Sequence, residues 1–205
     1  MIKTVDDTEA ERHRTKMKKR KAVQDAEAAG KTIEKGLLIV HTGTGKGKST
    51  AAFGLALRML GRGRRIGVVQ FIKGAWHSAE RDALEKFGDQ VVWHTMGEGF
   101  TWDTQDLKRD IAAAERAWAK ACELLAAPTL ALVILDELNI ALRYDFLDLS
   151  SVIATLRARR PDLHVVVTGR NAKPELIAAA DLVTDMSLVK HHFAAGVKAQ
   201  PGIEF

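Results

Sequence analysis

The sequence predicts an α/β fold of three layers, in which helices cover both faces of a mostly parallel sheet. From residue 36 onward, short apolar runs typical of strands alternate with longer segments typical of helices. One run, Leu-Val-Ile-Leu at 132–135, is apolar throughout, as expected for a strand covered on both faces. A glycine-rich segment at 43–47 joins the first expected strand to a helix. With 205 residues, the chain is long enough for one domain with its own core.

The expected elements follow one another in regular alternation. Strands are predicted at 37–41, 66–71, 91–95, 130–135 and 164–168, with a weaker one at 182–188. Asp181 and Asp185 interrupt the last strand, which favours an edge position for it. Helices are predicted at 48–60, 79–87, 104–126, 151–159 and 174–180. Asp103 is the expected N-cap of the long helix, and Pro128 follows its end.

Residues 1–35 differ in composition from the domain at 36–205 and predict a basic N-terminal helical arm. The run 12–21 is almost entirely basic, and the arm has few large apolar side chains, so it cannot form a core by itself. Three roles remain open for it: a solvated arm, a lid that docks over an anionic site, and a nucleic-acid tail.

Composition excludes several classes of protein. No apolar stretch approaches the roughly 20 residues that a membrane span needs, so no membrane partner is expected. The N-terminus lacks the apolar core of a signal peptide, which predicts a cytoplasmic protein. The single cysteine, Cys122, excludes an intramolecular disulfide and a cysteine-rich metal site. The net charge of +5 suits anionic ligands in general and does not specify nucleic acid.

The segment 43–50, Gly-Thr-Gly-Lys-Gly-Lys-Ser-Thr, predicts a phosphate-binding loop (P-loop). Strand, glycine-rich turn and helix in this order direct backbone N–H groups at an anion near the positive end of the helix. Lys48 is expected to reach a phosphate oxygen, and the Ser49 hydroxyl to bind Mg²⁺. The spacing departs from the strict motif because Thr42 replaces a glycine and Lys46 is an additional lysine. The residues expected to contact the nucleotide are Thr42, Gly43, Thr44, Gly45, Lys46, Gly47, Lys48, Ser49 and Thr50, with Lys73 and Arg170 from later loops.

Two acidic residues end the apolar strand at 130–135. Asp136 and Glu137 predict the second half of a nucleotide site, where a carboxylate holds Mg²⁺ directly or through water. In an ATP-hydrolysing enzyme the second carboxylate could instead activate water. An acidic cap on the following turn is the alternative without a function.

The remaining candidates follow other strand ends, where open α/β sheets bind ligands. Lys73 and Arg170 are candidate phosphate contacts, although a lysine there is almost as often a surface residue. Phe100 and Trp102 lie in a glycine-containing segment, 97–102, and predict either core packing or a movable lid for a large, flat co-substrate. The histidines, including the pair at 191–192, show no metal-ligand spacing with a cysteine or carboxylate cluster. The tail at 196–205 is either a packed extension or a loop at the site.

Taken together, the motifs resemble those of the P-loop-type ATP:corrinoid adenosyltransferases. Six blocks carry the resemblance in the same order: 42–54, 68–74, 99–102, 135–138, 168–170, and 189–191 with 196–200. The resemblance covers almost the whole chain. It implies a RecA-like sheet, ATP as co-substrate with Mg²⁺, and a cob(I)-state corrinoid as acceptor, in adenosylcobalamin biosynthesis or salvage. The reduced cobalt attacks the 5′-carbon of the ribose, and triphosphate leaves.

The resemblance also implies roles for single residues. Lys46 and Lys48 would stabilise the charge on the departing triphosphate. Ser49 and Glu137 would hold Mg²⁺, with Asp136 supporting them. The aromatic side chains of Phe100 and Trp102 would displace the lower ligand of the cobalt.

The same resemblance implies a homodimer whose N-terminal arm can cover a site, and an electron-donating reductase, expected to be a flavoprotein. Two other functions remain open from the sequence. One is a P-loop ATPase or kinase without corrinoid chemistry, and the other is a RecA-like protein that binds nucleic acid.

Overall fold

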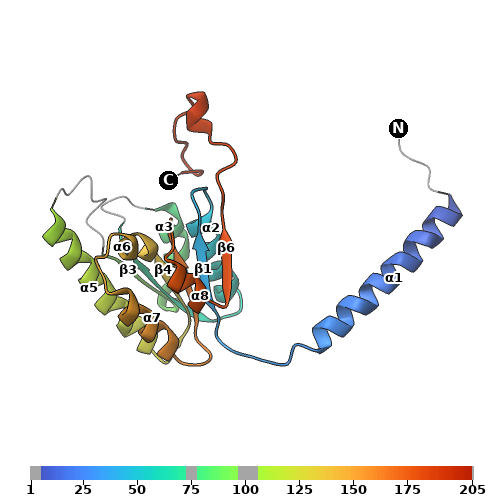
Figure 1. Ribbon diagram of the computed structural model, residues 1–205, viewed down its shortest axis with the longest axis horizontal. Helices are drawn as coiled ribbons and strands as arrows, with labels where there is room; N and C mark the ends of the chain where they lie inside the picture. Colours follow the sequence, from blue (N-terminus) through green and yellow to red (C-terminus); the bar gives the residue numbers. More distant parts are fainter. Residues whose placement is uncertain (1–5, 73–77, 97–105, 205) are drawn as a thin grey trace. The chain divides into compact units, whose positions relative to one another are not determined.

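A computed structural model describes residues 6–72, 78–96 and 106–204 and divides the chain into two units, 1–34 and 35–205 (Figure 1). The first unit contains α1 (Asp7–Ala29), whose N-cap Asp6 accepts a hydrogen bond from the backbone N–H of Glu9 at 2.8 Å. None of the residues of α1 is buried. None of the helices in the described ranges is both long and apolar enough to cross a membrane.

The second unit contains a six-stranded sheet in which every neighbouring pair is parallel. The strand order is β3-β2-β4-β5-β1-β6, so the edge position expected for the last strand is confirmed. The strands are β1 (Leu38–Thr42), β2 (Arg65–Gln70), β3 (Val91–Thr95), β4 (Leu130–Asp136), β5 (His164–Thr168) and β6 (Leu182–Asp185).

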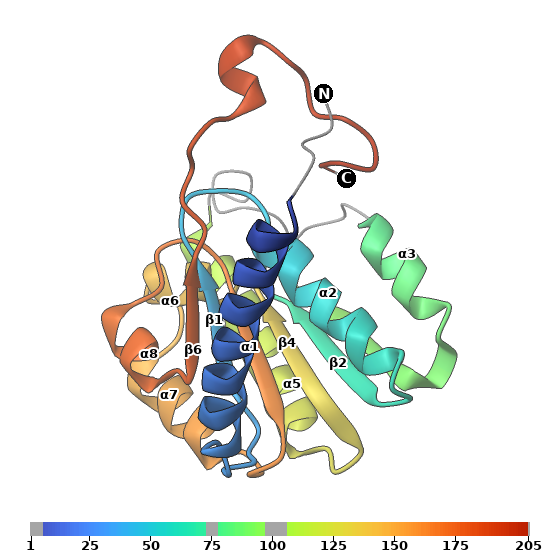
Figure 2. The ribbon, with the colours of Figure 1, turned by 90° about the vertical axis from the view of Figure 1, so that its right-hand side faces the viewer.

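Helices cover both faces of this sheet, as Figures 1 and 2 show. Alternate side chains of the central strands point to opposite faces: Ile134 packs in the cluster that includes α2, whereas Val133 packs in the cluster that includes α5. The first face carries α2 (Lys48–Leu60) and α3 (Ala79–Glu85). The second carries α5 (Leu107–Ala126), α6 (Leu138–Arg143), α7 (Leu149–Ala158) and α8 (Pro174–Ala179). The expected three-layer α/β fold is therefore confirmed.

Some predicted boundaries were wrong. The long helix α5 begins at Leu107, not at 104, and its N-cap is Asp106, whose side chain accepts a hydrogen bond from the Arg109 N–H at 3.2 Å. Asp103, the predicted cap, lies outside the described residues. The short helix α6 was not predicted, because it has only 6 residues and begins directly after Glu137, whose φ is +64°. Strand β6 ends at Asp185 rather than at 188.

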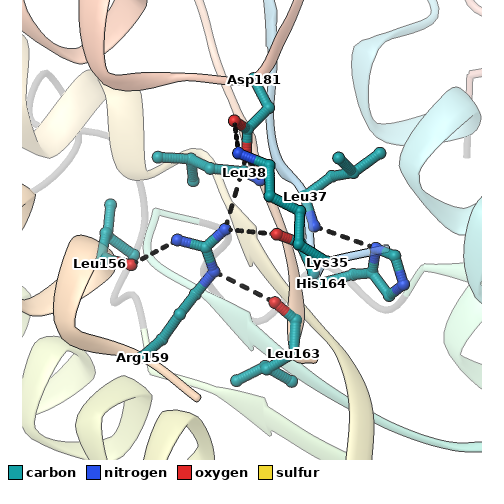
Figure 3. Close-up of polar contacts among 9 residues, drawn as sticks. Lys35, Leu37, Leu38, Leu156, Arg159, Leu163, His164 and Asp181 are labelled. Carbon is teal, nitrogen blue, oxygen red and sulfur yellow. Dashed lines mark hydrogen bonds and ion pairs between the residues drawn. The ribbon is translucent and has the colours of Figure 1, made fainter. Parts of the chain in front are cut away.

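A buried guanidinium fixes the chain where the sheet begins (Figure 3). Arg159 donates hydrogen bonds to the carbonyl oxygens of Gly36 at 2.9 Å, Leu156 at 2.6 Å and Leu163 at 3.1 Å. Its side chain is 10% exposed. These contacts join the end of α7 and the loop before β5 to the residues that precede β1.

Asp181 completes the same cluster on the β6 side (Figure 3). Its carboxylate accepts hydrogen bonds from Lys35 and from the Leu38 backbone N–H, the latter at 2.9 Å, and lies 3.7 Å from Arg159. The hydrogen bond from Lys35 and that from Leu38 hold the pKa of Asp181 below its usual value. The cluster therefore sets the register in which β1 enters the sheet between β5 and β6.

Candidate active site

The predicted phosphate loop connects the end of β1 to the first residue of α2. Gly43 and Gly47 have φ values of +99° and +106°, which L side chains rarely adopt. Because α2 begins at Lys48, the backbone N–H groups of its first turn are available to an anion. The local geometry is that of a strand, a glycine-rich turn and a helix N-terminus.

Loop residues form one wall of a cavity of about 480 Å³. This volume lies within the range of small-molecule sites. The cavity wall includes Gly45, Lys46, Gly47, Lys48, Ser49, Thr50, Ile72, Glu80, Glu137, Ile140, Arg143, Tyr144, Arg170, Ile203 and Glu204. Most of the predicted phosphate and metal contacts are thus brought together around one space.

The two loop lysines differ in environment. Lys48 is buried, and its ammonium donates a hydrogen bond to the Gly45 carbonyl oxygen. Burial lowers the pKa of Lys48, whereas the charge of Glu137 raises it and that of Arg170 lowers it further. Lys46 is 58% exposed and contacts the carboxylate of Glu204. The cavity therefore holds cationic side chains at different depths.

Asp136 and Glu137 have separate positions at the end of β4. Asp136 is fully buried and accepts hydrogen bonds from Thr168 Oγ1 at 2.8 Å and from Gln70 Nε2 at 3.0 Å. Glu137 lines the cavity, and its backbone N–H donates to Thr168 Oγ1 at 3.0 Å. Asp136 thus orients the neighbouring groups from inside the sheet, while Glu137 faces the cavity.

Gln70 and Thr168, which were not among the predicted site residues, take part in hydrogen bonds that connect four strands at this point. The Gln70 Oε1 accepts hydrogen bonds from Trp93 Nε1 at 3.2 Å and from Thr95 Oγ1 at 3.1 Å. A hydrogen-bonded chain therefore extends from the edge strand β3 through β2 and β4 to β5. Both residues are the last of their strands, which is the one sequence signal that could have identified them.

Gly169 is required next to this network. Its φ is +126°, and a Cβ there would lie 2.9 Å from the Asn139 Cβ and 3.0 Å from Glu137 Oε2. The Asn139 side chain donates to the Gly169 carbonyl oxygen at 2.9 Å. The turn that presents Arg170 to the cavity is thus packed against the residues around Glu137.

Several predicted site residues lie elsewhere or outside the description. Thr42 is buried, and its Oγ1 accepts a hydrogen bond from the Ala172 N–H at 3.0 Å, so its hydroxyl connects two loops. Thr44 is exposed, and it is not in the described cavity wall. Lys73, Phe100 and Trp102 lie outside the described residues.

The cavity also has walls that the sequence did not predict. Ile140, Arg143 and Tyr144 come from α6 and the residue after it. The Arg143 guanidinium lies 5.4 Å from the centroid of the Tyr144 ring, which stacks on Phe146 at 5.6 Å. Ile203 and Glu204 come from the C-terminal tail, so of the two alternatives, a packed extension or a loop at the site, the structure favours the second.

The donor set of the cavity fits a magnesium ion. The Ser49 hydroxyl and the Glu137 carboxylate both line it, and Mg²⁺ prefers oxygen ligands together with substrate phosphates. A second group of metal-ligand residue types, His191, His192 and Glu204, lies with one ligand atom of each within 4.8 Å of the others. The expectation that the histidines show no metal-ligand spacing with a carboxylate was therefore wrong for this pair. The two imidazole rings stack with planes 23° apart, and Glu204 Oε1 lies 3.3 Å from His192 Nε2.

Comparison with known proteins identifies the family. A family model described as "ATP:corrinoid adenosyltransferase BtuR/CobO/CobP" matches residues 34–205, and one described as "Cob(I)alamin adenosyltransferase N terminal" matches residues 4–27. The corrinoid adenosyltransferase of Pseudomonas aeruginosa is 56% identical over 195 residues, which cover 95% of this chain and 96% of the relative. A relative of the same name from Sinorhizobium is 55% identical over 95% of this chain and 92% of its own.

A less similar relative carries a name that agrees with the same family. The corrinoid adenosyltransferase CobA of Salmonella typhimurium is 46% identical over 195 residues, covering 95% of this chain and 98% of the relative. The family model spans the sheet, the phosphate loop and the C-terminal tail. The chain therefore belongs to the family of ATP:corrinoid adenosyltransferases and is a transferase that moves an adenosyl group from ATP to a corrinoid.

Proposed function

We propose that ATP binds with its phosphates on residues 45–50 together with Mg²⁺, and that the triphosphate leaves from this loop. One observation carries the proposal: Lys48, Arg170, Ser49 and Glu137 line the same cavity as the helix N-terminus. Cations and N–H groups suit the phosphate oxygens, and the two oxygen donors suit the metal.

The residues of the chain have distinct tasks in this proposal. The loop N–H groups and Lys48 bind the phosphates, Lys46 and Arg170 approach them from the solvent side, and Ser49 and Glu137 are the metal ligands. Asp136 acts through its hydrogen bonds inside the sheet. Bound Mg²⁺ would neutralise part of the phosphate charge.

In the transfer, the cobalt–carbon bond forms at the 5′-carbon while the carbon–oxygen bond to the α-phosphate breaks. The electron pair of that bond leaves on the triphosphate, so the leaving group gains negative charge. Lys46, Lys48 and the helix N-terminus stabilise that charge. No side chain acts as a general base, because the reduced cobalt carries no proton that must be removed.

We further propose that Phe100 and Trp102 contact the corrinoid and displace its lower ligand, as the family resemblance implies. Replacing Trp102 by alanine should leave ATP binding intact while reducing adenosylation of cob(II) corrinoids in the presence of a reductase. Equal rates on these corrinoids would contradict the role of Trp102.

The enzyme is further proposed to be a cytoplasmic homodimer that receives electrons from a flavoprotein reductase. Exposed apolar side chains on β6 and just beyond it support an association surface: Leu182 is 47% exposed, Leu188 48% and Val189 96%. Sedimentation of the whole chain is the direct test, and a monomer at micromolar concentration would contradict the dimer.

Calorimetric titration with ATP tests the nucleotide site. Lys48→Ala should lose at least about tenfold in ATP affinity, because a buried charge-assisted contact is removed. Glu137→Gln should bind metal-free ATP like the wild type but lose most of the gain in affinity that Mg²⁺ gives. Lys173→Ala is the matched control, since Lys173 pairs with Asp145 at 3.0 Å on the surface. Wild-type affinity in Lys48→Ala would refute the proposal.

A further inference from the structure

The segment that directly follows β6, residues 186–187, runs beside the phosphate loop (Figure 2). After β6, the Met186 N–H donates to the Thr42 carbonyl oxygen at 2.9 Å, and the Gly45 N–H donates to the Met186 carbonyl oxygen at 2.6 Å. A Cβ on Gly45 would lie 2.6 Å from the Met186 oxygen and 2.8 Å from the Ser187 oxygen. The absence of a side chain at Gly45 is thus required by the close approach of residues 186–187.

The tail returns to the loop at its end. The Glu204 N–H donates to the Gln200 carbonyl oxygen at 2.9 Å, which closes a turn that places Ile203 and Glu204 in the cavity wall. The Glu204 carboxylate contacts the Lys46 ammonium and lies 3.3 Å from His192 Nε2. Only 10% of the Glu204 side chain is exposed, against 58% of that of Lys46.

The Glu204 carboxylate is therefore a largely covered anion, while its partner is an exposed cation. The hydrogen bond from Lys46 holds the pKa of Glu204 below its usual value, so the group is ionised at neutral pH. Lysine has a long stem and three donors, and it can exchange one anion for another with little backbone change. A polyphosphate bound on the loop would have to draw the Lys46 ammonium away from Glu204 or share this ammonium with it. In either case the polyphosphate would lie near the negative charge of Glu204.

This competition matters most after the transfer, and the inference rests on the proposed binding of the phosphates at residues 45–50. Cleavage of the carbon–oxygen bond leaves a triphosphate that carries one more negative charge than the same group had in ATP. A site built from lysines and a helix N-terminus holds such a product tightly. We propose that Glu204 competes with the triphosphate for Lys46 and thereby eases release of the product.

Inorganic triphosphate is the probe for this competition. Its affinity, measured by calorimetry in Mg²⁺, should rise about fivefold in Glu204→Gln, the scale of one partly exposed ion pair. The inhibition constant of triphosphate in the transferase assay should fall by the same factor, and the KM for ATP should also fall. Glu204→Asp, which keeps the charge on a shorter stem, should lie between Glu204→Gln and the wild type.

Two control experiments distinguish the direct contact between Glu204 and Lys46 from the effect of net charge in the cavity. Glu80 lines the same cavity from α3, so Glu80→Gln removes the same charge from the same space. It should change triphosphate affinity by less than about twofold, because screening weakens a charge that has no direct contact with Lys46. In a Lys46→Ala background, Glu204→Gln should have no effect, because the shared partner is gone.

Several outcomes would overturn the inference. Unchanged or weaker triphosphate binding in Glu204→Gln would exclude competition and make Glu204 a residue that positions Lys46 for the phosphates. If Glu80→Gln raised triphosphate affinity equally, or if Glu204→Gln still raised it in the Lys46→Ala background, the effect would be due to the net charge of the cavity alone. If the wild type bound neither ATP nor triphosphate, the proposed nucleotide site would fail first, and the inference with it. Thermal unfolding of each variant checks that it is folded.

Discussion

Replacing Thr168 by valine tests whether the hydrogen bonds behind the site position Glu137. Thr168 is fully buried, and its hydroxyl donates to Asp136 at 2.8 Å while it accepts from the Glu137 N–H at 3.0 Å. Valine has nearly the same shape, so the substitution leaves no large cavity. It removes both hydrogen bonds and leaves a carboxylate oxygen and an N–H group without these partners.

The magnitude follows from these two contacts. A hydrogen bond to a charged group contributes about 1.5–3 kcal/mol, and a buried N–H without a partner costs about 1–3 kcal/mol. Their sum predicts a loss of about 2.5–6 kcal/mol in the free energy of unfolding, or a fall of about 5–24 °C in Tm for a domain of this size. Because Glu137 has a φ of +64°, losing this contact should also shift its carboxylate.

Urea denaturation and a magnesium titration of the transferase rate measure the two effects. If Glu137 holds Mg²⁺ as proposed, Thr168→Val should need about 10–100 times more Mg²⁺ for half-maximal rate, the usual consequence of removing a group that orients a metal ligand. Thr168→Ser keeps the hydroxyl and should retain the magnesium dependence of the wild type. A Thr168→Val protein within about 0.5 kcal/mol of the wild type and with the same magnesium dependence would refute the reasoning.

Two further predictions concern the loop and the start of the sheet. Gly45→Ala should lose about 1–3 kcal/mol of stability and weaken ATP binding, since its Cβ would meet Met186. Gly54→Ala is the control: Gly54 lies in a helix, a Cβ there would meet nothing within 4 Å, and the variant should gain about 0.5–1 kcal/mol. Thermal unfolding measures the stability of each variant, and calorimetry measures its ATP affinity. Asp181→Asn should lose about 1–3 kcal/mol at neutral pH. Because the folded-state pKa of Asp181 is depressed, its contribution is present above about pH 4 and is lost as the pH falls further. Urea denaturation at several pH values checks this, and a difference between wild type and Asp181→Asn that grows toward low pH would contradict it.

Local patterns were sufficient to predict much of the fold. The sequence places β3, β5 and α2 with the boundaries that the structure has, because apolar runs and a glycine-rich turn mark their ends. The phosphate loop and the acidic end of β4 were equally visible, since each motif is contiguous in the chain. The family comparisons then decided among adenosyl transfer, ATP hydrolysis and nucleic-acid binding in favour of the first.

Contacts between distant residues could not be predicted in this way. Gln70 meets Asp136 across 66 positions, and Lys46 meets Glu204 across 158, so only the strand order and the course of the tail bring them together. The hydrogen bonds that the two oxygens of Asp136 accept from Gln70 and Thr168 could not be predicted either, and its expected support of the magnesium ligands stays a prediction. The close approach of residues 186–187 to Gly45, where a Cβ would lie 2.6 Å from the Met186 oxygen, could not be predicted either.

The most direct test of the account is the stoichiometry of products from ATP and a reduced corrinoid. The wild-type enzyme should form one inorganic triphosphate for each light-sensitive adenosyl–cobalt bond, and Lys48→Ala should lose both products together. Formation of ADP and phosphate in step with the reaction, without an adenosyl–cobalt bond, would contradict a loop that holds the whole triphosphate while the 5′-carbon is attacked.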